Sequence, residues 1–221
     1  MALWMVVSFT WVTARQEAMT EDAVLAEMDT RAATLRSMRA AIEQRRWTDI
    51  LEEFDAGEAG SFQFLREGEE IYLRKNITEP QENTLILHEG KVLFYQPKIK
   101  QLQKYDLGQR RDRAEFMLLG FGSSKTDLQE TYDVRLLGKE TIDRHETYQL
   151  ELSPKSKEVS AYFARIVLWV DTSLWIPIQQ KLVEPTGDYI LIRFDEVELN
   201  PDIAKSEFEL KVPKDVTVVG G

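Results

Sequence analysis

The sequence predicts a mainly β fold, one curved antiparallel sheet of about ten or eleven strands whose apolar face is covered by helices. From Gly60 to the C-terminus, short runs of alternating apolar and polar residues are separated by turn residues, a pattern typical of strands. Only two long helical patterns accompany them, an amphipathic segment near the N-terminus and an insert at Arg111–Phe121. Two helices are too few to fill the inner face of such a sheet, so we expect an apolar hollow beneath them.

Length and composition fit one large β-rich domain. The chain has 221 residues, of which 43% are hydrophobic, and no linker or low-complexity tract divides it. We therefore predict a single domain over residues 15–221. The net charge of −10 repels phosphate backbones and anionic headgroups, which disfavours nucleic-acid binding and docking on a membrane surface. The alternative for most of these charges is that they serve solubility alone.

The first residues have the features of a secretory signal. Ala2–Val12 is an uncharged, mostly apolar run that is too short to span a bilayer, and Val12, Thr13 and Ala14 offer small residues where a signal peptidase cuts. We predict a signal peptide over residues 1–14, with a buried N-terminal strand as the alternative. The chain has no cysteine, which excludes disulfides, a thiol nucleophile and an acylated N-terminal cysteine.

An N-terminal helix is indicated by Thr20 as a capping residue, followed by two acidic residues at the positive end of the helix dipole. Apolar residues then recur at three- and four-residue spacing, which predicts one buried helix face as far as about Arg46: Leu25, Met28, Ala32, Leu35, Met38 and Ile42. The first strand is expected at Ile50–Phe54, before a turn at 55–57.

The remaining strands follow closely, with the clearest hairpin at Asn83–His88 and Lys91–Gln96 around Glu89-Gly90. The other expected strands are Ser61–Leu65, Ile71–Arg74, Gln101–Asp106, Tyr132–Leu137, His145–Leu152, Ala161–Val170, Ile176–Val183, Tyr189–Leu199 and Val216–Val219. A change of apolar parity predicts a bulge near Asp195-Glu196. Short helical turns are expected at Asp127–Glu130 and in Asp202–Phe208.

Signatures of catalysis are weak. The two histidines, His88 and His145, fall inside strands and lack metal-ligand spacing, and no GxSxG or Walker motif occurs. With 38 acidic residues, paired carboxylates have no discriminating value. We therefore predict no enzyme, no catalytic residue, no metal and no cofactor. An exported hydrolase that depends on His88 or His145 is the least favoured alternative.

The apolar residues of sheet and helices form a stronger set. We predict that they line one lipid-binding cavity: Leu25, Met28, Leu35, Phe62, Phe64, Leu73, Leu87, Phe94, Met117, Phe121, Trp169, Ile178 and Ile192. For any single residue, a place in the ordinary core is the more common outcome. The collective prediction depends on the shortage of covering elements, and Met-rich helical faces adapt to variable ligands.

Three segments are similar to motifs of one known family. Val92–Leu107 (VLFYQPKIKQLQKYDL) resembles a pattern of the outer-membrane lipoprotein carrier (LolA-like) family, although Leu93 stands where that family usually has tryptophan. Gly187–Asn200 and Phe208–Val218 are similar to the two closing motifs of the same family. The resemblance extends over roughly Glu21–Val219.

The resemblance implies a fold and a function. The fold is an incomplete, half-open antiparallel β-barrel with the helices as a lid over a hydrophobic cavity. The function is to carry acylated lipoproteins across the periplasm, from an inner-membrane ABC exporter to an outer-membrane receptor, as a soluble protein that we expect to be a monomer. Arg66 is the nearest counterpart of an arginine that tethers the lid in the family, with a strand-end salt bridge as the alternative. A lipid-binding or sensor module that regulates a protein partner is the second hypothesis.

Overall fold

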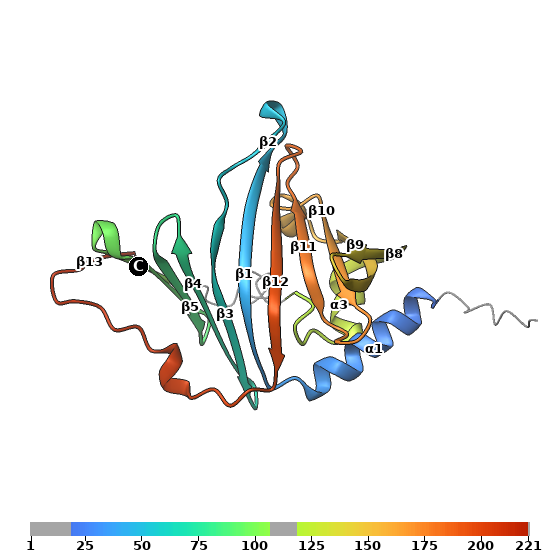
Figure 1. Cartoon of the computed structure of the whole chain (residues 1–221), viewed down its shortest axis with the longest axis horizontal. Coiled ribbons are helices and arrows are strands. Elements are labelled where there is room, and N and C mark those ends of the chain that lie inside the picture. Colours follow the sequence, from blue (N-terminus) through green and yellow to red (C-terminus); the bar gives the residue numbers. More distant parts are fainter. Residues whose placement is uncertain (1–18, 107–118, 221) are drawn as a thin grey trace, which may run out of the picture.

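A thirteen-stranded sheet dominates the computed structural model, which describes residues 19–106 and 119–220 (Figure 1). The strand order is β13-β7-β6-β5-β4-β3-β1-β12-β11-β10-β9-β8, and β2 pairs with β1 alone. The strands are β1 (Ser37–Thr48), β2 (Glu53–Phe54), β3 (Glu58–Glu67), β4 (Glu70–Glu79), β5 (Asn83–His88), β6 (Lys91–Gln96), β7 (Gln101–Asp106), β8 (Tyr132–Ile142), β9 (His145–Pro154), β10 (Arg165–Asp171), β11 (Pro177–Val183), β12 (Tyr189–Leu199) and β13 (Thr217–Val219). All neighbours are antiparallel except β13 and β7. The two ends do not meet, so the sheet is open.

In the described part of the chain, the helices are few and short. They are α1 (Glu21–Thr34), α3 (Lys125–Thr131) and α4 (Lys157–Ser160), with 3₁₀ turns η1 (Asp49–Leu51), η2 (Pro97–Ile99) and η4 (Lys205–Phe208). The expected insert helix falls mostly outside the described residues, and its described end, 119–121, lies in a turn. The predicted signal peptide, residues 1–14, also lies outside them. None of the helices in residues 19–106 and 119–220 has the length and apolarity to span a membrane.

The length of the N-terminal helix was predicted wrongly. Its start is as expected, because the Thr20 hydroxyl accepts a hydrogen bond from the Ala23 N–H at 3.2 Å. The helix ends at Thr34 rather than near Arg46, and Ser37–Thr48 forms the central strand β1, which pairs with β3 and β12. Met38, Ala40 and Ile42 are all buried, and their spacing of two fits a strand. Pairing on both edges outweighs the weaker helical periodicity.

The expected first strand was wrong for the same reason. Asp49–Leu51 is a 3₁₀ turn at the tip of the β1–β2 hairpin, and only Glu53–Phe54 pairs with β1. Because β1 is an additional strand and β2 still pairs with it, the sheet has thirteen strands rather than the expected ten or eleven. The hairpin β5–β6 has the expected bounds. The bulge is also confirmed, since Arg39 pairs with Glu198, Ala41 pairs with Asp195, and Glu196 between them has a φ of 52°.

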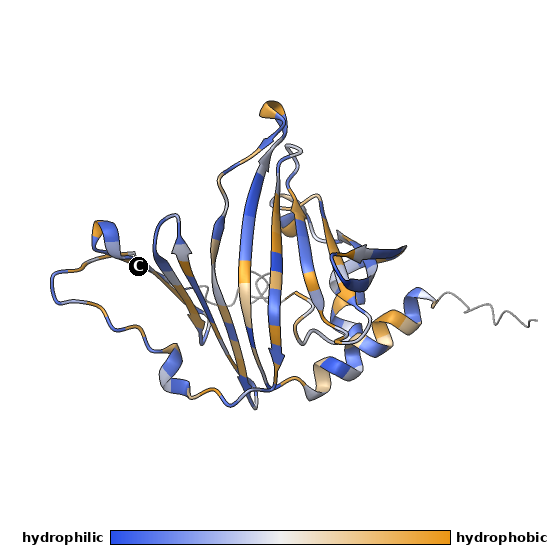
Figure 2. Cartoon of the chain, in the orientation of Figure 1, coloured by the Kyte–Doolittle hydropathy of each residue, from blue (hydrophilic) through white to orange (hydrophobic). Residues whose placement is uncertain are grey.

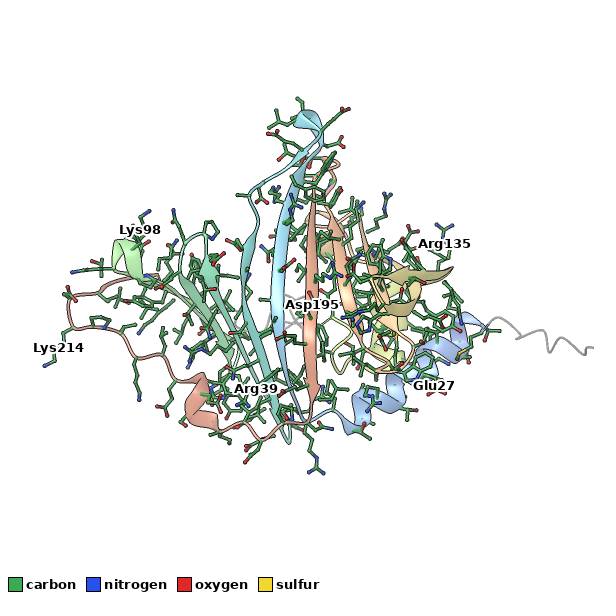
Figure 3. The ribbon with its side chains drawn as sticks, viewed as in Figure 1. Glu27, Arg39, Lys98, Arg135, Asp195 and Lys214 are labelled. Atoms are coloured by element: carbon green, nitrogen blue, oxygen red, sulfur yellow. The ribbon has the colours of Figure 1, made fainter. Side chains whose placement is uncertain are left out.

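The sheet has two different faces. On the inner face, defined by the residues that pack against α1, α3 and residues 119–121, side chains form two large apolar clusters. Apolar and polar residues alternate along the long strands (Figure 2). Charged side chains such as Glu27 of α1 and Arg135 of β8 lie at the periphery (Figure 3). On the outer face, Ile203 and Phe208 pack on Leu65 and Tyr72.

The segment 201–208, which we call the C-terminal strap, is fastened to the outer face by Glu207. Arg39 Nη2 donates to both carboxylate oxygens at 2.9 Å, and Gln63 Nε2 donates to one of them at 2.8 Å. Burial alone would raise the pKa of Glu207, but the hydrogen bonds from Gln63, Arg39 and the Ala204 N–H outweigh it and lower the pKa. The strap is thus held in part by an ionised carboxylate.

We expect Glu207→Gln to lower the free energy of unfolding at pH 7 by about 0.2–1 kcal/mol, because the ion pair is partly exposed. Because the pKa of Glu207 is lowered in the folded state, the ionised carboxylate makes its full contribution to stability above the ordinary glutamate pKa of about 4.3. This contribution is lost as the pH falls through the lowered pKa. Urea unfolding at several pH values checks it. A difference between wild type and variant that does not shrink as the pH falls below 4 would contradict the assignment.

Candidate functional site

The inner face brings together most of the residues predicted to line a cavity. Leu25 and Met28 of α1 join one apolar cluster with β8–β11. The second cluster contains Leu35, Phe62, Phe64, Leu73, Leu87 and Phe121. Ile192 is half-buried and packs against both clusters. These nine side chains therefore lie in two apolar clusters, joined by Ile192, between the sheet and its cover, by which we mean α1, α3 and residues 119–124.

Trp169 was placed on the wrong face. Ile166, Leu168 and Val170 belong to the inner cluster, and strand alternation directs Trp169 to the opposite side. There its indole N–H donates to Glu140 Oε2 at 2.7 Å. Because β10 is buried on both faces, its apolar run carried no parity signal.

Three further residues are not brought into this surface. Ile178 is buried at a register shift, where Trp169 pairs with Gln179 and Val170 with Pro177, and it belongs to neither cluster. Phe94 is half-buried and lines a separate pocket of about 230 Å³ with polar neighbours such as Glu58 and Lys98. Met117 lies outside the described residues.

A cavity of about 190 Å³ lies where the sheet meets its cover. Its lining includes Ile71, Leu119, Phe121 and Leu128, with Arg66 among its polar members. The volume is below the roughly 300–1,000 Å³ that is usual for small-molecule sites. A larger, open groove of about 710 Å³ shares Arg66 as a wall, but residues such as Arg36 and Glu67 make it polar. The apolar cavity is therefore the better candidate for lipid, and it is small in this conformation.

Arg66 joins the two parts of the cover. Its Nη1 donates to the Ala32 carbonyl of α1 at 3.1 Å, and its Nη2 donates to the Gly122 carbonyl at 3.0 Å. The Ala32 carbonyl lies in the last turn of α1. If the helix continued, this carbonyl would accept a hydrogen bond from the Arg36 N–H, but that N–H donates to Asn200 Oδ1 instead. Arg66 thus satisfies a helix-end carbonyl, and its contacts are to backbone oxygens rather than to a salt-bridge partner.

The environment of this guanidinium is unusual for an arginine. Burial lowers the pKa of Arg66, and the Phe64 ring lies 5.6 Å from its Cζ atom. Two carbonyl dipoles and an aromatic ring thus replace part of the water around the charge, and they stand where a carboxylate would otherwise balance it. A Cβ atom on Gly122, whose φ is +99°, would lie 1.9 Å from Nη2, so this contact depends on glycine at that position.

Other polar contacts fasten α1 at several points. The Lys125 N–H at the start of α3 donates to Asp29 Oδ1 at 2.9 Å, and Lys125 also forms an ion pair with Asp22. Arg31 Nε donates to the Leu174 carbonyl at 2.8 Å, and the Leu136 N–H donates to Glu21 Oε2 at 3.2 Å. Each contact is worth about 0.5–1.5 kcal/mol on its own. The cover is closed by several separable contacts.

Neither histidine forms part of a hydrolytic arrangement with a described nucleophile. His145 Nδ1 lies 2.7 Å from Asp171 Oδ2. The second oxygen of Asp171 accepts hydrogen bonds from the Ser173 and Leu174 N–H groups, at 2.7 and 2.8 Å. This pair therefore shapes the β10–β11 turn. His88 stacks on Tyr72 on the outer face, away from the cavity.

Comparison with known proteins identifies the family. Residues 24–211 match the model of the family described as "Outer membrane lipoprotein carrier protein LolA". The chain belongs to the LolA family. No curated protein sequence matches it.

Solved structures show that the LolA-family fold recurs at low sequence identity. An uncharacterized conserved protein from Thermus thermophilus is 14% identical, with a TM-score of 0.58 over 92% of this chain and 100% of that chain. MucB in the Pseudomonas aeruginosa MucA/MucB complex is 12% identical, with a TM-score of 0.51 over 86% of this chain and 61% of that one. These likenesses extend to the fold alone.

We expect Arg66→Leu to speed hydrogen exchange of the α1 amides about 5- to 150-fold. The variant loses two hydrogen bonds from a charged group but no longer bears the cost of burying that charge, so the net loss is about 1–3 kcal/mol. Hydrogen–deuterium exchange with mass spectrometry measures this. Gly122→Ala should act in the same direction by displacing Nη2. Arg36→Leu is the matched control, since Arg36 is exposed and lines the same groove. Equal exchange in Arg66→Leu and wild type would exclude a tether.

Proposed function

We propose that this LolA-family chain is a periplasmic carrier that shields the acyl chains of lipoproteins during their transfer towards the outer membrane. The observation that carries the proposal is the apolar inner face beneath a cover that Arg66 holds through two backbone carbonyls. Arg66 is then a lid contact, and the nine inner-face residues named above become the contacts of the acyl chains once the lid opens.

The energetics of acyl transfer require such a device. Each methylene removed from water contributes about 0.8 kcal/mol, so one palmitoyl chain represents roughly 12 kcal/mol. That free energy keeps the chain in the membrane unless a carrier offers a comparable apolar surface. The polar contacts of the lid are individually weak. When the lid opens, these contacts and the apolar packing of the lid are lost, and packing against the acyl chain replaces them. Because loss and gain offset each other, the protein can both take up and release the chain. A cavity of about 190 Å³ is too small for such cargo, so loading must move the lid.

The proposal includes partners. An inner-membrane ABC exporter would deliver the lipoprotein and an outer-membrane receptor would accept it, without catalysis, metal or cofactor at the inner face. Export by the signal peptide proposed at residues 1–14 is consistent with this place of action. The carrier acts as a monomer in this scheme, because one inner face holds the acyl chains of one cargo molecule.

A binding or sensor module is the second candidate, and one observation favours it. Ile50 and Leu51 at the tip of the β1–β2 hairpin are 89% and 62% exposed, and exposed apolar residues at a loop tip suit contact with a protein partner. MucB, a structural relative, has been solved in complex with MucA. In this alternative the chain would bind a protein partner through such a surface. Crosslinking that captures the same partner after lipid is stripped from the protein would favour it.

The test of the carrier is binding of a triacylated lipopeptide, measured by native mass spectrometry against the same peptide without acyl chains. We expect a one-to-one complex with the acylated form only. Ile71→Trp should weaken binding at least tenfold, because it fills the cavity under the lid. Trp169→Phe is the matched control on the outer face and should bind as wild type. Absence of acyl binding by folded wild-type protein would overturn the proposal.

A further inference from the structure

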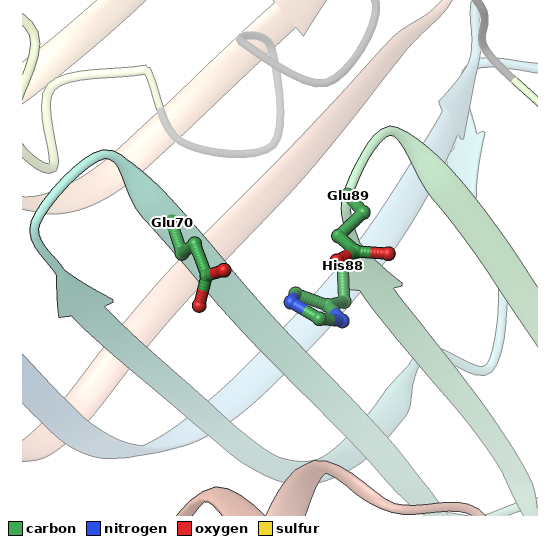
Figure 4. Close-up of side chains that lie close together, drawn as sticks. All are labelled: Glu70, His88 and Glu89. Carbon is green, nitrogen blue, oxygen red and sulfur yellow. The ribbon is translucent and has the colours of Figure 1, made fainter.

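Three metal-ligating side chains meet on the outer face of the sheet, remote from the inner surface. They are Glu70, His88 and Glu89, and one ligand atom from each lies within 4.8 Å of the others (Figure 4). The register pairs Tyr72 with His88, so Glu70, two residues before Tyr72, lies on the same face of β4. Glu89 follows His88 directly and starts the β5–β6 turn with a φ of 50°. Two strands and one turn thus bring the three ligands together.

His88 supplies an independent observation. Its Nε2 is the one buried side-chain nitrogen or oxygen in residues 19–106 and 119–220 that has no hydrogen-bond partner. Buried polar atoms almost always have a partner, and an ion or an ordered water is a usual explanation for an exception. The ring is fixed in place, because Tyr72 stacks on it with centroids 3.9 Å apart and planes 14° apart. Figure 4 shows a ring nitrogen directed towards the Glu70 carboxylate.

The surroundings of Glu70 suit a metal ligand. The Tyr72 hydroxyl donates to Glu70 Oε2 at 2.7 Å, which orients the carboxylate and leaves Oε1 available. Lys205 Nζ lies 3.5 Å from Glu70 Oε2 but only 2.8 Å from Glu67 Oε2, so Lys205 can keep its closer partner when a cation binds Glu70.

We propose that Glu70, His88 and Glu89 bind one divalent transition-metal ion, with Zn²⁺ as the best match. One imidazole nitrogen and two carboxylate oxygens are ligands that zinc accepts, with bonds of about 2.0–2.2 Å, and water can complete the tetrahedron. Those bonds require ligand atoms no more than roughly 4 Å apart. Glu70 and Glu89 are exposed and can close the small remaining distance. The bound ion ties β4 to the β5–β6 turn.

Sequence spacing could not show this site. Eighteen positions separate Glu70 from His88, and only the pairing of β4 with β5 makes them neighbours. The prediction that the chain has no metal site rested on spacing along the chain alone. The proposed metal site is also separate from the acyl-binding face. Ile71 and Leu73, the neighbours of Glu70 and Tyr72 along β4, pack with the inner cluster, so the metal ligands lie on the opposite face of the strand.

The composition of the chain makes the test sharp. It has two histidines and no cysteine, so a Zn²⁺ ion with an imidazole ligand must use His88 or His145. Isothermal titration of the full chain with ZnCl₂ in a non-chelating buffer should give one site per chain. His88→Gln should weaken binding at least tenfold. His145→Gln, which alters the partner of Asp171 instead, should bind as wild type.

A second variant keeps the result independent of folding. Glu89→Gln changes an exposed turn residue and should also weaken Zn²⁺ binding several-fold, with an unchanged unfolding transition in the absence of metal. Zn²⁺ should raise the melting temperature of wild type but not of His88→Gln. Nitrogen-15 spectra of the imidazole should report metal at Nε2. No saturable binding by wild type, equal binding by His88→Gln, or an equal loss in His145→Gln would overturn the proposal.

Discussion

The need to cover the apolar inner face of an open sheet governs this structure. Within residues 19–106 and 119–220, few residues form the helices of that cover: α1 has fourteen residues and α3 has seven. Leu25 and Met28 reach one apolar cluster, while Leu35 and Phe121 reach the other. A thicker helical layer would supply more apolar packing between cover and sheet. Here polar contacts through Asp29, Arg31 and Arg66 add to that apolar packing, and each of them can be broken separately.

Local patterns sufficed for the antiparallel hairpins but not for the central strand. The β5–β6 hairpin has its own turn residues and the bulge at Glu196 a change of parity, so both could be predicted. Residues 37–48 carry apolar residues at spacings that suit helix and strand alike, and their partners β3 and β12 are distant in sequence. Trp169 failed for a related reason, because β10 is apolar on both faces. Both corrections depend on contacts between segments that are distant in sequence, which no single segment records.

The two faces of β4 illustrate how one strand can serve two purposes. Ile71 and Leu73 pack inwards with the apolar cluster, while Glu70 and Tyr72 face outwards towards His88 and the strap. Nine of the thirteen proposed cavity residues meet on the inner surface, because amphipathic strands reveal parity when one face is polar. The cluster of Glu70, His88 and Glu89 gave no such signal. Its members are ordinary surface residues until strand pairing places them together.

The contacts of Arg66 have an evolutionary consequence. Its acceptors are the main-chain oxygens of Ala32 and Gly122, which every amino acid supplies. Substitutions at position 32 can therefore accumulate without a compensating change at 66, provided the new side chain packs. Methods that infer proximity from correlated substitutions would miss the link between positions 32 and 66, and a homologue could keep the closure while position 32 diverges, provided that glycine stays at position 122.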